Sequence, residues 1–153
     1  MQTNPSDVER LLFIMASLPE FLRLSLARRK LRELISMNES DRMLTILQVI
    51  RCLNSLDPHM IGRLVTSWIK EMCALDSKIL TELMVIYCNI LLNEKNFINT
   101  YSATFLDGYN SLPKEDQGRI LTGVKEALLM SPNQLELVDK LPEAIKTIMG
   151  IRN

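Results

Sequence analysis

The stretch "DSKILTELMVIYCNILLN", Asp76–Asn93, decides what kind of fold this chain can form. Hydrophobic side chains occupy almost every side of its helical wheel, and only a narrow stripe of Glu82, Asn89 and Asn93 is polar. A helix that is hydrophobic nearly all round must be covered by other elements on most of its sides. We therefore expect this helix at the centre of the core, with Asp76 as its N-terminal cap.

The segments on either side of this stretch also have a helical pattern. Hydrophobic residues recur every three or four positions, as in Met43–Leu53 and Ile61–Met72, and no segment alternates as a strand does. Ser40 and Asn96 are further candidate caps. Prolines suit the first turn of a helix, and all six fall where a helix would start: Pro5, Pro19, Pro58, Pro113, Pro132 and Pro142. The sequence predicts an all-α chain of eight or nine helices.

Composition sets the broad class of the protein. The chain has 153 residues, enough for a single domain over residues 1–153, and its 47% hydrophobic content is typical of a folded globular protein. The 18 Lys and Arg residues balance 18 Asp and Glu residues, so no net charge attracts nucleic acid or an anionic membrane. Asp7 and Glu9 stand where a secretory signal would be positive, and the apolar run Leu83–Leu92 is too short to cross a bilayer. Because the three cysteines are odd in number and lie in helical patterns, we expect reduced thiols and a cytoplasmic location.

Two segments of the chain match at a fixed offset of 56 residues. "NSLDPHMIGRLVT", Asn54–Thr66, and "NSLPKEDQGRILT", Asn110–Thr122, share Asn-Ser-Leu, Gly-Arg, a pair of aliphatic residues and Thr. We extend this internal repeat to residues 54–72 and 110–128. Helix starts near positions 19, 58, 96 and 132 are also spaced by 36 to 39 residues, which is close to the hairpin spacing of HEAT-like arrays.

The helix entries add a resemblance at the level of fold. "LPE" at Leu18 and Leu141, and "LPK" at Leu112, resemble the helix–turn spacing of armadillo-like superhelical domains over most of the chain. The resemblance implies stacked helical hairpins in a short α-solenoid, in which each hairpin covers its neighbour. The alternative is a compact globular helical bundle, in which the repeat is a chance similarity between two amphipathic helices.

The sequence offers little for catalysis. The five glycines form neither a phosphate loop nor a dinucleotide fingerprint, and His59 is the single histidine. Zinc ligands usually come in close pairs, whereas Cys52, His59, Cys73 and Cys88 are scattered over the pattern of three helices. We therefore predict no enzyme activity, no metal site and no cofactor. An enzyme that used His59 would need a pocket around that residue.

A basic segment, "SLARRKLREL" at Ser25–Leu34, lies in a helix expected over residues 22–35. Charge runs of this kind are usually solvated or paired within the chain, for instance Arg29 with Glu33, and this is our first interpretation. Leu22 and Leu26 point away from the hydrophobic stripe of that helix and are surrounded by cations, which also suits a contact surface for an adjacent helix or for an acidic partner. The remaining alternative is nucleic-acid binding. The cations, which spread around the remaining wheel, are Arg23, Arg28, Arg29, Lys30 and Arg32.

Aromatic residues form a second candidate surface. Phe97, Tyr101, Phe105 and Tyr109 recur every four residues and share one helical face. Such a stripe suits either a groove for a partner helix or simple packing. No Lys or Arg occurs between Asn96 and Pro113, which disfavours base stacking on nucleic acid.

Taken together, these patterns predict a non-enzymatic protein–protein interaction or scaffolding module that presents a helical surface to another helix or peptide. The candidate partner-binding residues are Leu22, Leu26, Arg28, Arg29, Lys30, Arg32, Tyr101 and Tyr109. The alternative is a helical protein that associates with nucleic acid through the basic helix over residues 22–35.

Overall fold

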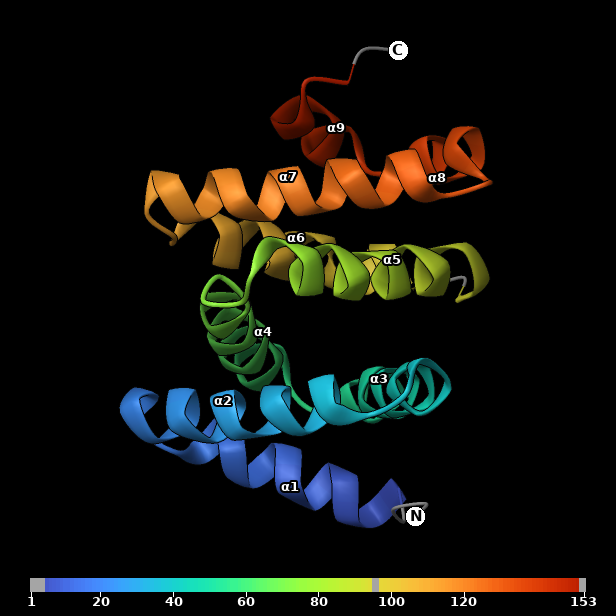
Figure 1. Cartoon of the computed structure of the whole chain (residues 1–153). Helices are drawn as coiled ribbons and strands as arrows, with labels where there is room; N and C mark the ends of the chain where they lie inside the picture. The colour runs from blue at the N-terminus through green and yellow to red at the C-terminus, as the bar shows by residue number, and fades with distance from the viewer. Residues whose placement is uncertain (1–4, 95–96, 152–153) are drawn as a thin grey trace. The chain divides into compact units, whose positions relative to one another are not determined.

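The computed structural model describes residues 5–94 and 97–151, and within them the chain forms nine α-helices and no strand (Figure 1). This confirms the all-α prediction, and the packing of neighbouring helices fits a helical bundle. The helices are α1 (Pro5–Ser17), α2 (Glu20–Ser36), α3 (Glu39–Leu53), α4 (Pro58–Met72), α5 (Ser77–Asn93), α6 (Phe97–Asn110), α7 (Lys114–Met130), α8 (Gln134–Lys140) and α9 (Glu143–Met149).

The chain divides into two compact units, residues 1–72 and 73–153. The first unit contains α1 to α4, and the second contains α5 to α9. The single domain over residues 1–153 and the stacking of hairpins in a solenoid stay predictions.

Prolines mark the helix starts, as the sequence predicts. Pro5 and Pro58 are the first residues of α1 and α4, and three others occupy the N-cap positions of α2, α7 and α9. Pro132 lies in the turn two residues before α8 begins at Gln134. The fixed φ of proline fits each of these positions, and its missing N–H would have no partner there.

The predicted caps have different outcomes. Asp76 caps α5, because its Oδ1 accepts a hydrogen bond from the backbone N–H of Ile79 at 3.1 Å. Ser40 is not the cap of α3: Asn38 takes this place, and its Oδ1 accepts from the N–H of Asp41 at 2.8 Å. Asn96 lies outside the described residues.

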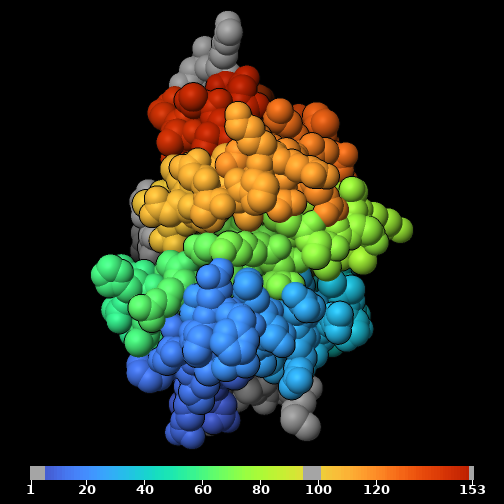
Figure 2. All heavy atoms as spheres, turned by 90° about the vertical axis from the view of Figure 1, so that its left-hand side faces the viewer, coloured from blue at the N-terminus to red at the C-terminus, as the bar shows by residue number. Residues whose placement is uncertain are grey.

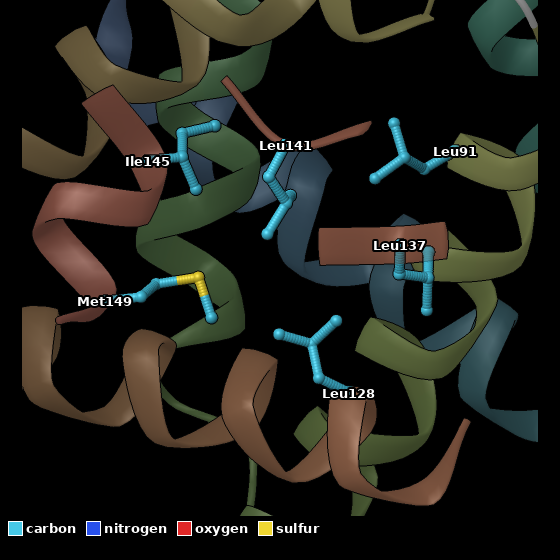
Figure 3. Packing of buried hydrophobic residues seen from close by; sticks show 6 residues of the cluster. All are labelled: Leu91, Leu128, Leu137, Leu141, Ile145 and Met149. Atoms are coloured by element: carbon cyan, nitrogen blue, oxygen red, sulfur yellow. The ribbon is translucent and has the colours of Figure 1, made fainter. Parts of the chain in front are cut away.

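Helix α5 holds the core of the second unit, as its sequence predicts. It packs against α7 and also contacts α6 and α8. Its buried side chains include Leu80, Leu83 and Ile90, whereas Glu82 is exposed. A connected cluster continues from this helix through α7 and α8 to α9 (Figure 3), and its members are Leu91, Leu128, Leu137, Leu141, Ile145 and Met149.

A glycine of α7 lies close to the side chains of α5. A Cβ atom at Gly123 would lie 3.3 Å from Cγ of Leu80 and 3.5 Å from Cγ of Met84. The missing side chain therefore lets the backbone of α7 come near α5. At Gly118, one turn earlier in α7, a Cβ atom would meet no neighbouring atom within 4 Å.

In the first unit, α1 packs against α3 and α4, and α2 packs mainly against α4. The arginine of each Gly-Arg pair in the predicted repeat bonds to carbonyls at or just beyond the C-terminus of a preceding helix. Arg63 donates to the carbonyl of Ala16 in α1 at 3.2 Å, and Arg119 donates to the carbonyls of Cys73 and Leu75 after α4. Such carbonyls have no partner within their own helix. The two matched segments thus use their arginines alike, while the repeat itself stays a prediction.

Glycines 118 and 123 generate a matched stability prediction. Gly118→Ala should raise the free energy of unfolding by about 0.5–1 kcal/mol, because alanine loses less backbone entropy in an open helical position. Gly123→Leu should lower it by about 1–3 kcal/mol, because the new side chain overpacks the contact with Leu80. Urea unfolding followed by far-UV circular dichroism measures both values, and equal effects of the two substitutions would contradict the close approach at Gly123.

Candidate functional site

The cations of α2 fall into two groups, and the first group is used within the fold. Arg23 is buried, its Nε donates to Oγ of Ser67 in α4 at 2.8 Å, and its Nη1 donates to the carbonyl of Leu18 at 2.7 Å. These bonds replace the water that the guanidinium loses. The interpretation of Arg23 as part of the outlying charge on the wheel is therefore wrong, since its side chain lies in the contact between α2 and α4.

Arg28 also serves the contact between α2 and α4. Its Nε and Nη2 donate to the two carboxylate oxygens of Glu71 at 3.0 and 3.2 Å, a bidentate arrangement. The Glu71 side chain is only 8% exposed, whereas that of Arg28 is 57% exposed. The hydrogen bond and the charge of Glu71 raise the pKa of the Arg28 guanidinium above its ordinary value. Arg28 thus satisfies a buried carboxylate while its outer edge faces water.

Two further ion pairs involve α2. Lys70 of α4 donates to Glu20 at 2.6 Å, and this hydrogen bond, with the charge of Lys70, lowers the pKa of Glu20. Lys30 pairs with Glu33 at 3.2 Å. Glu33 therefore pairs with Lys30, three residues before it, and not with Arg29 as the sequence suggests. Exposed ion pairs of this kind contribute little stability. They do neutralise the charges of Glu20, Lys30 and Glu33 within the chain.

The second group consists of Arg29 and Arg32, which are exposed and form no ion pair with the described residues. They share one face of α2 with two apolar side chains, Phe21, which is 71% exposed, and Leu22, which is 43% exposed. We call Phe21, Leu22, Arg29 and Arg32 the α2 outer face. Figure 2 shows α2 in blue at the surface of the first unit. This face combines apolar area with two available guanidinium groups.

Phe21 is exposed but was not among the residues predicted from the sequence, and Leu26, which was predicted, is less accessible. Leu26 is half-buried, so it contributes less than Leu22. Phe21 is the second residue of α2. Because it lies eleven residues before Arg32, Phe21 and Arg32 fall on the same side of the helical wheel. That spacing was the available signal. Lys30 is half-buried and paired, which leaves it a minor part of the surface.

The two tyrosines of the aromatic stripe are buried. Tyr101 and Tyr109 of α6 are 7% and 6% exposed, and the rings of Phe105 and Tyr109 are stacked with centroids 6.3 Å apart. Burial raises the pKa of Tyr101 to about 12. The side chain of Phe97 lies outside the described residues. We therefore favour the packing interpretation and do not place Tyr101 and Tyr109 in the candidate surface.

The groups with catalytic chemistry do not converge. His59 is exposed in the first turn of α4, and no three His, Cys, Asp or Glu residues among the described ones could together hold a metal ion. Cys52 and Cys73 are buried and Cys88 is half-buried. Burial raises the pKa of Cys73 and of Cys88 to about 11. A thiol with so high a pKa is a poor nucleophile, because the thiolate is the reactive form.

Polar side chains line part of the groove between α5 and α7, and some of them already have partners within the fold. Thr81 donates to Glu126 at 2.7 Å, and Arg119, which also lines the groove, donates to the two carbonyls that follow α4. His59 is not among the residues that line it. This groove therefore is not the pocket around His59 that an enzyme using this residue would need.

The chain matches no protein-family model, and no curated protein or solved structure is significantly similar to it. None of the helices in the described part of the chain is both long enough and apolar enough to span a membrane.

Arginines 28 and 29 are adjacent on the surface and should respond differently to truncation. Arg28→Ala should lower the free energy of unfolding, because it leaves the buried Glu71 carboxylate without its bidentate partner. Arg29→Ala should change it by less than about 0.5 kcal/mol, as is usual for an exposed residue outside such contacts. Urea unfolding measures both, and equal stability of the two variants would contradict a structural role for Arg28.

The raised cysteine pKa values predict slow thiol labelling. At about pH 8, a pKa of about 11 leaves roughly one thiolate in a thousand, so Cys73 and Cys88 should label about a hundredfold more slowly than an ordinary cysteine thiol. A colorimetric thiol assay on the folded protein and on the protein in denaturant compares the rates. Rapid labelling of all three cysteines in the folded protein would contradict their burial.

Proposed function

We propose that this chain is a non-enzymatic protein-interaction module, whose α2 outer face binds an acidic amphipathic helix of a partner protein. The observation that carries the proposal is the position of Arg29 and Arg32, which have no ion pair among the described residues, beside the exposed Phe21. An acidic helix with an apolar stripe would cover the aromatic ring and supply carboxylates to both guanidinium groups.

Each part of the face has a separate role in this binding. Aromatic and arginine side chains are the residues that most often dominate the binding energy of protein interfaces. The arginine fork donates to two carboxylate oxygens at once, which selects an acidic partner and fixes its register. Arg23 and Arg28 of α2 bond to Ser67 and Glu71 of α4 and so fix the position of the helix. Little backbone entropy is therefore lost when the partner binds.

The nucleic-acid alternative draws less support from the same charges. A protein that binds a phosphate backbone usually brings many cations together. Of the five cations on α2, Arg23, Arg28 and Lys30 are bonded to groups of this chain. Two available arginines beside a phenylalanine and a leucine suit a protein partner better.

The proposal also includes the finer architecture. Within residues 54–72 and 110–128, several residues 56 positions apart are both buried, as with Leu64 and Ile120, Ser67 and Gly123, and Met72 and Leu128, whereas Ile69 is buried and Lys125 is exposed. This agreement supports a short α-solenoid with an internal repeat at 54–72 and 110–128. Cys52, Cys73 and Cys88 form no disulfide bond, which supports a cytoplasmic location.

A pair of synthetic peptides tests the proposed function. One is an amphipathic helix with a leucine stripe and glutamates elsewhere, and the other has lysines in place of the glutamates. Fluorescence anisotropy should show that the full chain binds the acidic peptide and not the basic one. R29E/R32E should weaken binding about tenfold or more, since charge reversal adds repulsion to the lost contacts.

The matched control is K114E/K125E, which makes the same change in net charge at two exposed lysines of α7. It should bind the acidic peptide like the unmodified chain. Equal binding of the two peptides, or an equal loss in the control, would overturn the proposal. Tighter binding of single-stranded DNA than of the acidic peptide, with a steep salt dependence, would favour the nucleic-acid alternative instead.

A further inference from the structure

The turn between α7 and α8 (Figure 1) carries a second group of exposed apolar side chains. Leu129, Met130 and Leu135 are 74%, 66% and 84% exposed. The turn is closed by a hydrogen bond from Nε2 of Gln134 to the carbonyl of Leu129 at 2.9 Å. The three apolar side chains therefore belong to one short, defined segment. Where exposed apolar side chains form a continuous patch, the patch often marks a surface that another protein covers.

The charge beside this cluster is negative. Glu136 and Asp139 are exposed on α8, and Asp139 lies one turn after Leu135 on the same face. Asp139 forms no ion pair with the described residues, whereas Glu136 lies 3.5 Å from Nζ of Lys140. Lys140 is itself held at 2.8 Å by the carbonyl of Leu92. We call Leu129, Met130, Leu135, Glu136 and Asp139 the α7–α8 corner.

We infer that the partner of the α2 outer face is the α7–α8 corner of a second copy of this chain. The inference rests on the proposed function, and it names the acidic helix as α8. The two surfaces are complementary in kind, because each has large exposed apolar side chains and the arginines of one are opposite in charge to the carboxylates of the other. Of these carboxylates, Asp139 forms no ion pair with the described residues, whereas Glu136 shares its charge with Lys140.

The distribution of charge over the chain agrees with this pairing. The first unit has ten Lys and Arg against eight Asp and Glu, a net charge of +2, and the second has eight against ten, a net charge of −2. The net charge of the whole chain is zero because the net charges of its two units are equal in size and opposite in sign. Attraction between unlike units of two copies would speed their encounter and favour this orientation.

The symmetry of such an association has a consequence. Each copy contributes a different surface, so the interface is heterologous, and every added copy leaves one α2 outer face and one α7–α8 corner available. Self-association should therefore continue beyond the dimer unless the rotation between copies closes a ring.

Sedimentation analysis of the full chain tests the inference. The average mass of the unmodified protein should rise with protein concentration beyond that of a dimer. R29E/R32E should stay monomeric because its basic surface is reversed, and E136K/D139K should stay monomeric because its acidic surface is reversed. K114E/K125E is the control and should associate like the unmodified chain.

Mixing the two surface variants gives the sharpest outcome. R29E/R32E keeps an intact α7–α8 corner, and E136K/D139K keeps an intact α2 outer face. An equimolar mixture should therefore associate although each variant alone is monomeric, because the two intact surfaces match and the two reversed surfaces are again opposite in charge. Circular dichroism verifies that both variants are folded. A mixture of the two folded variants that stays monomeric would overturn the assignment of the corner.

The result separates this inference from the proposed function. If the unmodified chain stays monomeric at every concentration and still binds the acidic peptide, self-association is overturned and the proposed function stands. If it neither associates nor binds the peptide, both are overturned.

Discussion

Helix α5 has so few polar positions that it is stable in water only when other helices cover it. This requirement organises the second unit: α7 approaches α5 at Gly123, α6 and α8 contact it, and the hydrophobic cluster continues to α9. Helix α8 is short, and its Leu137 is fully buried in this cluster. The side of α8 opposite Leu137, which carries Leu135 and Asp139, therefore faces water. The exposure of Leu135 and Asp139 is thus a consequence of how α5 is covered.

The first unit solves a similar packing problem with charge. Where α5 meets α7 through Leu80, Met84 and Gly123, α2 meets α4 through hydrogen bonds and ion pairs, above all the bidentate contact of Arg28 with Glu71. Removing one partner of such a contact leaves a buried charge unsatisfied, whereas a substitution in an apolar contact leaves a cavity or a clash and no unsatisfied charge. The polar contact therefore fixes α2 in one orientation, and this orientation decides which cations remain for another molecule.

Much of this fold follows from local sequence, but the pairing of its side chains does not. Prolines and Asp76 mark helix starts because capping depends on neighbouring residues alone. The burial of Arg23 could not be predicted in this way, since its partner Ser67 lies 44 residues away and a helical wheel contains no information about what the neighbouring helix carries. For the same reason the role of Arg28 was invisible without Glu71. Phe21 is different, because the helical wheel alone places it on the same side as Arg32. The prediction from the basic run named Leu22 and Leu26 and not Phe21.

The basic run of α2 is therefore best understood as two functions in one helix. Arg23 and Arg28 stabilise the contact with α4 through Ser67 and Glu71. Among the arginines of α2, only Arg29 and Arg32 lack such a contact with the described residues. A surface with two available charges and two apolar side chains gives selectivity for the sign of the partner's charge more than high affinity, because exposed ion pairs contribute little energy and the apolar area is small. High affinity from such a surface requires that several copies act together, since linked weak contacts reinforce one another. Under the self-association that we propose, copies of this chain would gain such reinforcement only by closing a ring, because each contact in an open row of copies acts alone.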